Sequence, residues 1–136
     1  MTISEKQAAL VDEFAFFDDW MDKYNHIIEM GKSLKPLNEE DKQEDLLVQG
    51  CQSKVWLKAE KQGEAIKFWA DADAIIAKGI VAMLIDVFDE QPAREIAQAE
   101  LDFIQEIGLK DHLSPTRANG LMSMIKQMKI YALAFA

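Results

Sequence analysis

Apolar residues near the start of the chain recur every three or four positions, the spacing that places side chains on one face of a helix. This spacing predicts two helices, with the apolar stripes Leu10, Val11, Phe14 and Phe17, and then Trp20, Tyr24, Ile27 and Ile28. Ser4 and Gln7 have the form of a capping box and are expected to start the first helix. Gly31 stands where a left-handed residue would end the second.

The middle of the chain changes from a polar connection to an alternating pattern. From Lys32 to Asp45 the residues are mostly polar, Pro36 is expected to break the helix, and the run 38–41 indicates at most one capped helical turn. Apolar and polar residues then alternate over 55–60 and over 66–70, with Gln62 and Gly63 between them. This alternation predicts an antiparallel hairpin, which residues 46–49 could widen to three strands.

The pattern in the second half of the chain predicts helices. The segment 74–89 is apolar nearly all round and predicts a helix buried at the centre of the core, with Asp71 and Asp73 able to cap its start. Pro92 is expected to open a short helix, and residues 101–109 another that ends near Gly108.

Ser114 followed by Pro115 predicts the N-cap and first position of a last helix. Its expected core stripe is Leu121, Met124, Ile125 and Met128. No repeat or linker divides the chain, so we expect residues 1–136 to form a single α+β domain, a small antiparallel sheet of two or three strands packed against several helices.

Composition narrows the classes of partner. The 136 residues are 49% apolar and 29% charged, ordinary values for one globular domain that needs no disulfide. The formal charge of -9 repels phosphate backbones and anionic lipids, so we expect neither nucleic acid nor a membrane surface as a partner. The first residues lack the basic start and apolar core of a secretory signal, and a cytoplasmic location is expected.

Cys51 is the only cysteine and can form neither an internal disulfide nor a cysteine-rich metal site. Gly50 frees the backbone before it, and Gln52 and Ser53 are polar where a buried strand would be apolar, which indicates a junction of loop and strand. If the strand already begins at Cys51, the thiol shares a face with Val55 and the following inward residues. Apolar surroundings would raise its pKa and make it slow to react in the isolated protein.

The segment QGCQSKVWL, residues 49–57, resembles the signature segment of the SufE family of sulfur acceptors. Three further segments resemble that family in the same order: DWMDKYNHIIEMG, ADADAIIAKGIVAMLI and HLSPTRANGL. Together the four segments run from about residue 19 to 121, which is most of the chain.

The resemblance implies that Cys51 accepts sulfane sulfur from the persulfide of a pyridoxal-phosphate-dependent cysteine desulfurase, SufS-like, and stimulates that enzyme. It also implies delivery of the sulfur to iron–sulfur scaffold proteins. The chain would then be a covalent carrier of sulfurtransferase type and not a stand-alone enzyme, with no cofactor or metal of its own. A paralogous branch of the family delivers sulfur to other acceptors, and one sequence leaves that destination open.

The same resemblance singles out residues around the thiol. Gly50, Gln52 and Ser53 are expected in the loop and in contact with the partner. Arg117 matches the arginine of the family's HLSPTRANGL segment, where it could meet a partner carboxylate or stabilise a thiolate. The family often carries an arginine and an asparagine where this chain has Lys42 and Leu46, which leaves open how the loop is held.

Two other classes of function compete with the carrier. A non-covalent adaptor would keep Cys51 only as a packing residue, as free cysteines often are. A thiol redox enzyme would need a thiol that reacts in isolation, and no resolving cysteine exists here. His26 with Glu29, and Asp71 with Asp73, have the spacing of metal ligands but lack the further ligands that zinc or calcium needs.

Overall fold

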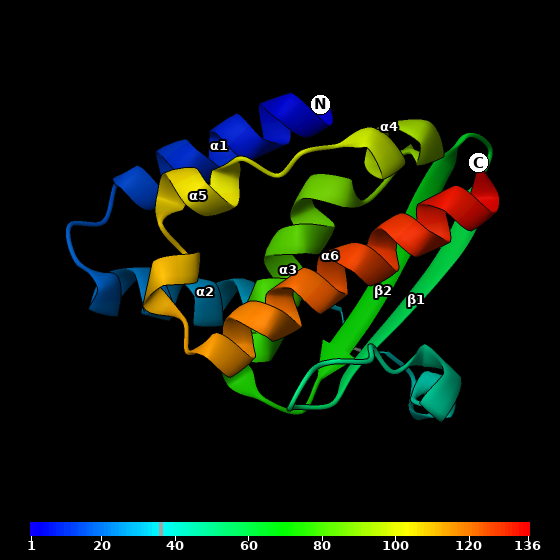
Figure 1. The fold of residues 1–136 in the computed structure, drawn as a ribbon, viewed down its shortest axis with the longest axis horizontal. Coiled ribbons are helices and arrows are strands. Elements are labelled where there is room, and N and C mark those ends of the chain that lie inside the picture. The colour runs from blue at the N-terminus through cyan, green and yellow to red at the C-terminus, as the bar shows by residue number, and fades with distance from the viewer. Residues whose placement is uncertain (36) are drawn as a thin grey trace.

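The computed structural model describes residues 1–35 and 37–136, so the helix breaker expected at Pro36 lies outside the described residues. Its helices are α1 (Ile3–Ala15), α2 (Trp20–Lys32), α3 (Ile75–Phe88), α4 (Ala93–Gln98), α5 (Phe103–Ile107) and α6 (Pro115–Phe135). Its strands are β1 (Val55–Gln62), β2 (Ala65–Ala72) and β3 (Gln91–Pro92), and single 3-10 turns are η1 (Glu39–Asp41), η2 (Glu44–Leu46) and η3 (Lys110–His112). This is the expected α+β fold (Figure 1).

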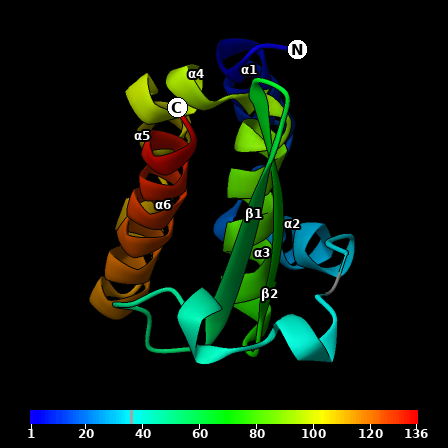
Figure 2. The ribbon, with the colours of Figure 1, turned by 90° about the vertical axis from the view of Figure 1, so that its right-hand side faces the viewer.

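The predicted hairpin and the predicted central helix are both confirmed. Strands β1 and β2 pair antiparallel along their whole length, from Val55 with Ala72 to Gln62 with Ala65. Their inward side chains are buried: Val55, Leu57, Ile66, Phe68 and Ala70. Helix α3 packs against β2, and α2, α1 and α6 pack around α3. Figure 2 shows α3 behind the hairpin, with α6 on one side of it and α2 on the other.

The third strand lies elsewhere than predicted. Strand β3 pairs with β2 through Ile66 with Gln91, and the sheet order is β1-β2-β3. Residues 46–49 form no strand. Leu47 makes one isolated bridge with Trp56, and the N–H of Val48 donates to the carbonyl of Val55 at 2.8 Å. Pairing stops there because Gly50, with φ of 92°, turns the chain away from β1.

The capping box of α1 begins two residues earlier than predicted. Thr2 is the N-cap: its hydroxyl accepts from the N–H of Glu5 at 3.1 Å, and its own N–H donates to Glu5 Oε1 at 2.9 Å. Ser4 is therefore already helical, and Ile3 is buried. The helix also ends early, at Ala15, so Phe17 belongs to the connection that follows.

The prediction that Gly31 ends α2 is wrong. The residue lies inside the helix, which continues to Lys32 and has Ser33 as its right-handed C-cap. A Cβ on Gly31 would lie only 2.8 Å from the backbone nitrogen of Gly79 in α3. Position 31 needs a glycine because the backbones of α2 and α3 are in direct contact there, and the local sequence does not reveal this contact.

The caps proposed from Asp71 and Asp73 are also wrong. The N-cap of α3 is Ala74, and no side chain caps it. Asp71 instead binds two lysines, and Asp73 Oδ1 accepts from the N–H of Lys54 at 2.9 Å. Similarly, the predicted turn at 38–41 forms as η1, but the Asn38 side chain makes no capping hydrogen bond.

The last helices follow the sequence closely. Gly108, with φ of 80°, ends α5, and the hydroxyl of Ser114 accepts from the N–H of Arg117 at 3.2 Å to cap α6. The predicted core stripe of α6 is buried: Leu121, Met124, Ile125 and Met128. Among the helices formed by residues 1–35 and 37–136, none is both long enough and apolar enough to cross a bilayer.

Candidate functional site

Cys51 lies in the loop that connects η2 to β1. Strand β1 begins only at Val55, so the strand does not already begin at Cys51, and the thiol lies in the loop that precedes it. The thiol is nonetheless half-buried, because the loop lies against α6 and the sulfur atom is 3.6 Å from the carbonyl oxygen of Gly120. In Figure 2 this loop reaches across beneath the N-terminal end of α6.

Gly50 lets the loop come this close to α6. Gly50 has φ of 92°, and a Cβ on it would lie 2.4 Å from Ser123 Oγ of α6. On the helix side, a Cβ on Gly120 would lie 3.5 Å from Cys51 Sγ, an ordinary contact distance. The freedom predicted for the backbone at Gly50 is confirmed, and the reason is both the turn and the close approach.

The base of the loop is closed by backbone hydrogen bonds. Before the thiol, the N–H of Val48 donates to the carbonyl of Val55. After it, the N–H of Asp73 donates to the carbonyl of Lys54 at 3.0 Å, while the Asp73 carboxylate accepts from the Lys54 N–H. Residues 49–53 therefore project from a fixed base, and their contacts with α6 determine where the thiol lies.

A cavity of about 100 Å³ opens beside Cys51. It is lined by Gln52, Ser53 and Val55 of the loop and strand, Ala77 and Ile80 of α3, and Thr116, Arg117, Gly120 and Met124 of α6. A single water needs only about 15 Å³, so the space can hold a further atom bonded to the thiol. Burial among these groups raises the pKa of the Cys51 thiol above its ordinary value of 9.0.

The cavity brings together side chains that the sequence singled out separately. Gln52 and Ser53 from the loop and Arg117 from the first turn of α6 all line it with Cys51. Sequence reasoning missed Gly120, Ser123 and the α3 wall. The one available signal for Gly120 was a glycine inside a regular helix, where glycine is unfavourable.

Neither histidine lines the Cys51 cavity. His112 stacks on Trp20 with ring centroids 3.9 Å apart, and His26 Nε2 lies 3.2 Å from Glu13 Oε1. Within the described part of the chain, no three His, Cys, Asp or Glu side chains gather as metal ligands. Arg117 is the only cation among the residues that line this cavity, and no histidine there can serve as a base.

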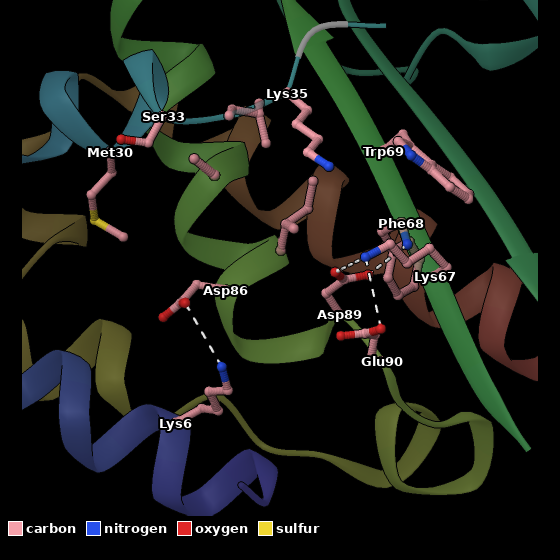
Figure 3. Close-up of a pocket in the computed structure, with 13 residues that line it drawn as sticks. Lys6, Met30, Ser33, Lys35, Lys67, Phe68, Trp69, Asp86, Asp89 and Glu90 are labelled. Atoms are coloured by element: carbon pink, nitrogen blue, oxygen red, sulfur yellow. Dashed lines mark hydrogen bonds and ion pairs between the residues drawn. The ribbon is translucent and has the colours of Figure 1, made fainter. Parts of the chain in front are cut away.

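A second cavity, of about 430 Å³, lies between α2, α3 and β2 and has a different character (Figure 3). Its charged groups compensate one another: Lys67 lies 3.1 Å from Asp89, and Lys6 lies 3.9 Å from Asp86. Asp89 also accepts from the N–H of Phe68 at 2.8 Å. The lining contains neither the thiol nor a histidine, so the candidate chemistry lies at Cys51.

Comparison with known proteins shows the family of the chain. The SufE model, described as an Fe-S metabolism associated domain, matches residues 8–132. An uncharacterized SufE-like protein of Rhizobium meliloti is 42% identical over 125 residues, which cover 88% of this chain and 89% of the relative. An uncharacterized SufE-like protein of Synechocystis is 35% identical over 134 residues, which cover 98% of this chain and 84% of the relative.

The fold has a counterpart among solved structures. The solution structure of a hypothetical protein from Thermus thermophilus matches with a TM-score of 0.79 over 96% of this chain and 95% of that one, at 15% identity. That likeness concerns the fold alone, whereas the family model and the relatives define the family. The chain belongs to the SufE family, which connects it with iron–sulfur metabolism.

Proposed function

We propose that the protein is a sulfur carrier which accepts persulfide sulfur on Cys51 from a SufS-like, pyridoxal-phosphate-dependent cysteine desulfurase. It stimulates that desulfurase by removing its sulfur and passes the sulfur to iron–sulfur scaffold proteins. The pyridoxal phosphate belongs to the desulfurase. Residues 1–136 act as one acceptor domain in the cytoplasm.

The transfer is an exchange between a thiolate and a persulfide. The Cys51 thiolate attacks the outer sulfur of the donor persulfide, the bond between the two donor sulfurs breaks, and the donor cysteine leaves as a thiolate. Cys51 then carries the persulfide, and the outer sulfur keeps the proton that it had on the donor. The proton that the Cys51 thiol gave up to become a thiolate is balanced by the one that the leaving donor thiolate takes up. No external oxidant or reductant takes part.

The observation that carries the proposal is the small cavity beside a half-buried thiol on an outer loop. A loop can reach into a partner's active site, whereas a thiol fixed in the core cannot. When the loop returns to α6, the about 100 Å³ beside Cys51 can hold the added sulfur atom away from other thiols. The raised pKa keeps the empty carrier from reacting with unrelated electrophiles.

The side chains around the thiol suit contact with a partner. Gln52 is exposed beside Cys51, and Arg117 is exposed at the start of α6. With Gly50 and Ser53 they form the proposed contact surface. The Arg117 guanidinium can pair with a carboxylate of the desulfurase or stabilise the Cys51 thiolate during transfer.

The test separates the carrier from an adaptor. Cys51→Ser should still bind the desulfurase, because it retains the surface around the loop, but it should no longer stimulate turnover. Ser33→Ala, a change of similar size at the C-cap of α2 and outside the Cys51 cavity, is the control and should retain stimulation. Full stimulation by Cys51→Ser would reject the carrier and support a non-covalent adaptor.

A further inference from the structure

A buried carboxylate lies at the end of β2, close to the base of the Cys51 loop. Asp71 is only 5% exposed. Its Oδ2 lies 3.2 Å from the Lys42 ammonium and its Oδ1 lies 3.4 Å from that of Lys78, while Oδ1 also accepts from the N–H of Ala72 at 2.8 Å. A buried carboxylate stays charged only when it is paired and hydrogen-bonded, so the two lysines and the Ala72 N–H together keep Asp71 ionised.

The two lysines come from separate segments of the chain. Lys42 lies between η1 and η2, in the segment that leads to the thiol, and its ammonium is 5.5 Å from the centre of the Trp56 ring. Lys78 lies on α3 directly after Ala77, which lines the Cys51 cavity. Trp56 in turn pairs with Asp71 across the hairpin and bridges to Leu47. Asp71 thus connects the incoming loop segment, the hairpin and the cavity wall.

We propose that Asp71 is a positioning residue for Cys51, holding the segment 42–48 and the α3 wall in register so that the loop rests on α6. This proposal rests on the proposed sulfur-carrier function, in which Cys51 has to be sheltered between transfers. Asp71 does not touch the sulfur. It acts through Lys42 and Lys78, and its loss leaves the thiol in place but less sheltered.

The other end of the same hairpin provides a matched comparison. There Asp89 accepts from the N–H of Phe68 and lies 3.1 Å from the Lys67 ammonium, with the two side chains 21% and 30% exposed (Figure 3). Both aspartates therefore bind one backbone N–H and at least one lysine. Only Asp71 is connected to the segment that leads to Cys51.

The experiment measures the rate at which iodoacetamide alkylates Cys51 in the folded protein without denaturant. Asp71→Asn should accelerate alkylation about tenfold, the change expected when a local opening equilibrium loses a charge-assisted hydrogen bond. Lys42→Met should act in the same direction, and Lys42→Arg should stay closer to the wild-type rate, because a guanidinium keeps the positive charge that pairs with the Asp71 carboxylate. Asp89→Asn and Lys67→Met should change the rate by less than about twofold, because they do not touch the loop.

Two results would overturn the proposal. Equal acceleration by Asp71→Asn and Asp89→Asn would mean that global opening exposes the thiol, and unchanged rates in both Asp71→Asn and Lys42→Met would mean that the contacts do not position the loop. If Asp71→Asn fails to fold, the Lys42→Met and Lys42→Arg pair decides, since both keep Asp71 bound to Lys78.

Alkylation requires no desulfurase, so this test is independent of the proposed function. A wild-type protein that never accepts sulfur would reject the carrier while leaving the alkylation comparison interpretable. Where sulfur is accepted, the Cys51 persulfide of Asp71→Asn should be lost to added glutathione about tenfold faster than that of wild type, in parallel with alkylation.

Discussion

Replacing Gly50 by alanine tests how the loop is held against α6. The substitution has two costs that the structure separates. The φ of 92° at position 50 lies beyond the left-handed helical region near +57°. A residue with a Cβ loses about 1–2 kcal/mol of stability even within that region. The new Cβ would also lie 2.4 Å from Ser123 Oγ, so either the loop or the serine must move.

Gly63→Ala measures the cost of a positive φ without the steric contact. Gly63 also has positive φ, 65°, in the hairpin turn, but a Cβ there would meet nothing within 4 Å. We expect Gly63→Ala to lower the free energy of unfolding by about 1–2 kcal/mol and Gly50→Ala to lower it by about 1 kcal/mol more. The double variant Gly50→Ala with Ser123→Ala should recover part of that excess, because it removes the Oγ that the new Cβ meets but leaves Ser123 Cβ at 3.3 Å and the positive φ of residue 50.

Urea unfolding of the wild type and of these three variants, followed by circular dichroism, measures these differences. Alkylation of Cys51 should also be faster in Gly50→Ala and unchanged in Gly63→Ala, because only the former pushes the loop from the helix. If Gly50→Ala costs no more than Gly63→Ala and leaves alkylation unchanged, the contact between Gly50 and Ser123 does not hold the loop.

Three further predictions concern packing and charge. Gly79→Ala should destabilise the protein by about 2 kcal/mol in urea unfolding, since a Cβ there would lie 2.3 Å from the carbonyl oxygen of Ile27, and any stabilisation would contradict the backbone contact of α2 with α3. Burial raises the pKa of Cys51 above 9.0. The rate of alkylation should therefore rise with pH, and the pH midpoint of this rise should be higher in the native protein than in the urea-unfolded chain. A lower midpoint in the native protein would contradict the apolar surroundings of the thiol. Burial acts to raise the pKa of Asp71, but the Ala72 N–H, Lys42 and Lys78 outweigh burial and lower the pKa below 3.8. The stability of the wild type relative to Asp71→Asn should therefore be greatest well above pH 3.8 and should shrink as the pH falls below it. A stability difference that does not change through this pH range would contradict the pairing.

Elements governed by local pattern were predictable from the sequence. The alternation around Gln62 and Gly63 identified the hairpin, the apolar segment identified α3, and Ser114 with Pro115 identified the start of α6. Each of these signals depends on neighbours within a few residues. The family resemblance likewise rested on contiguous segments, and it is confirmed.

The errors arose where a distant contact decides the role of a residue. Gly31 resembles a helix end but accommodates Gly79 of another helix. Asp71 resembles a cap but binds Lys42, from a separate segment. At the first helix the capping box was expected at Ser4, whereas Thr2 caps the helix together with Glu5, and Ile3 is buried. The candidate residues that the sequence indicated, Cys51 with its chain neighbours and Arg117, line one cavity, whereas Gly120 and the α3 wall required the fold.

The central claim is that Cys51 accepts sulfur, and intact-protein mass spectrometry tests it most directly. Wild-type protein and Cys51→Ser would each be incubated with a SufS-like cysteine desulfurase and cysteine, and weighed before and after a reductant. A gain of one sulfur atom that the reductant removes and that Cys51→Ser lacks is the predicted result. No gain in the wild type beside an active desulfurase, or an equal gain in Cys51→Ser, would contradict the account.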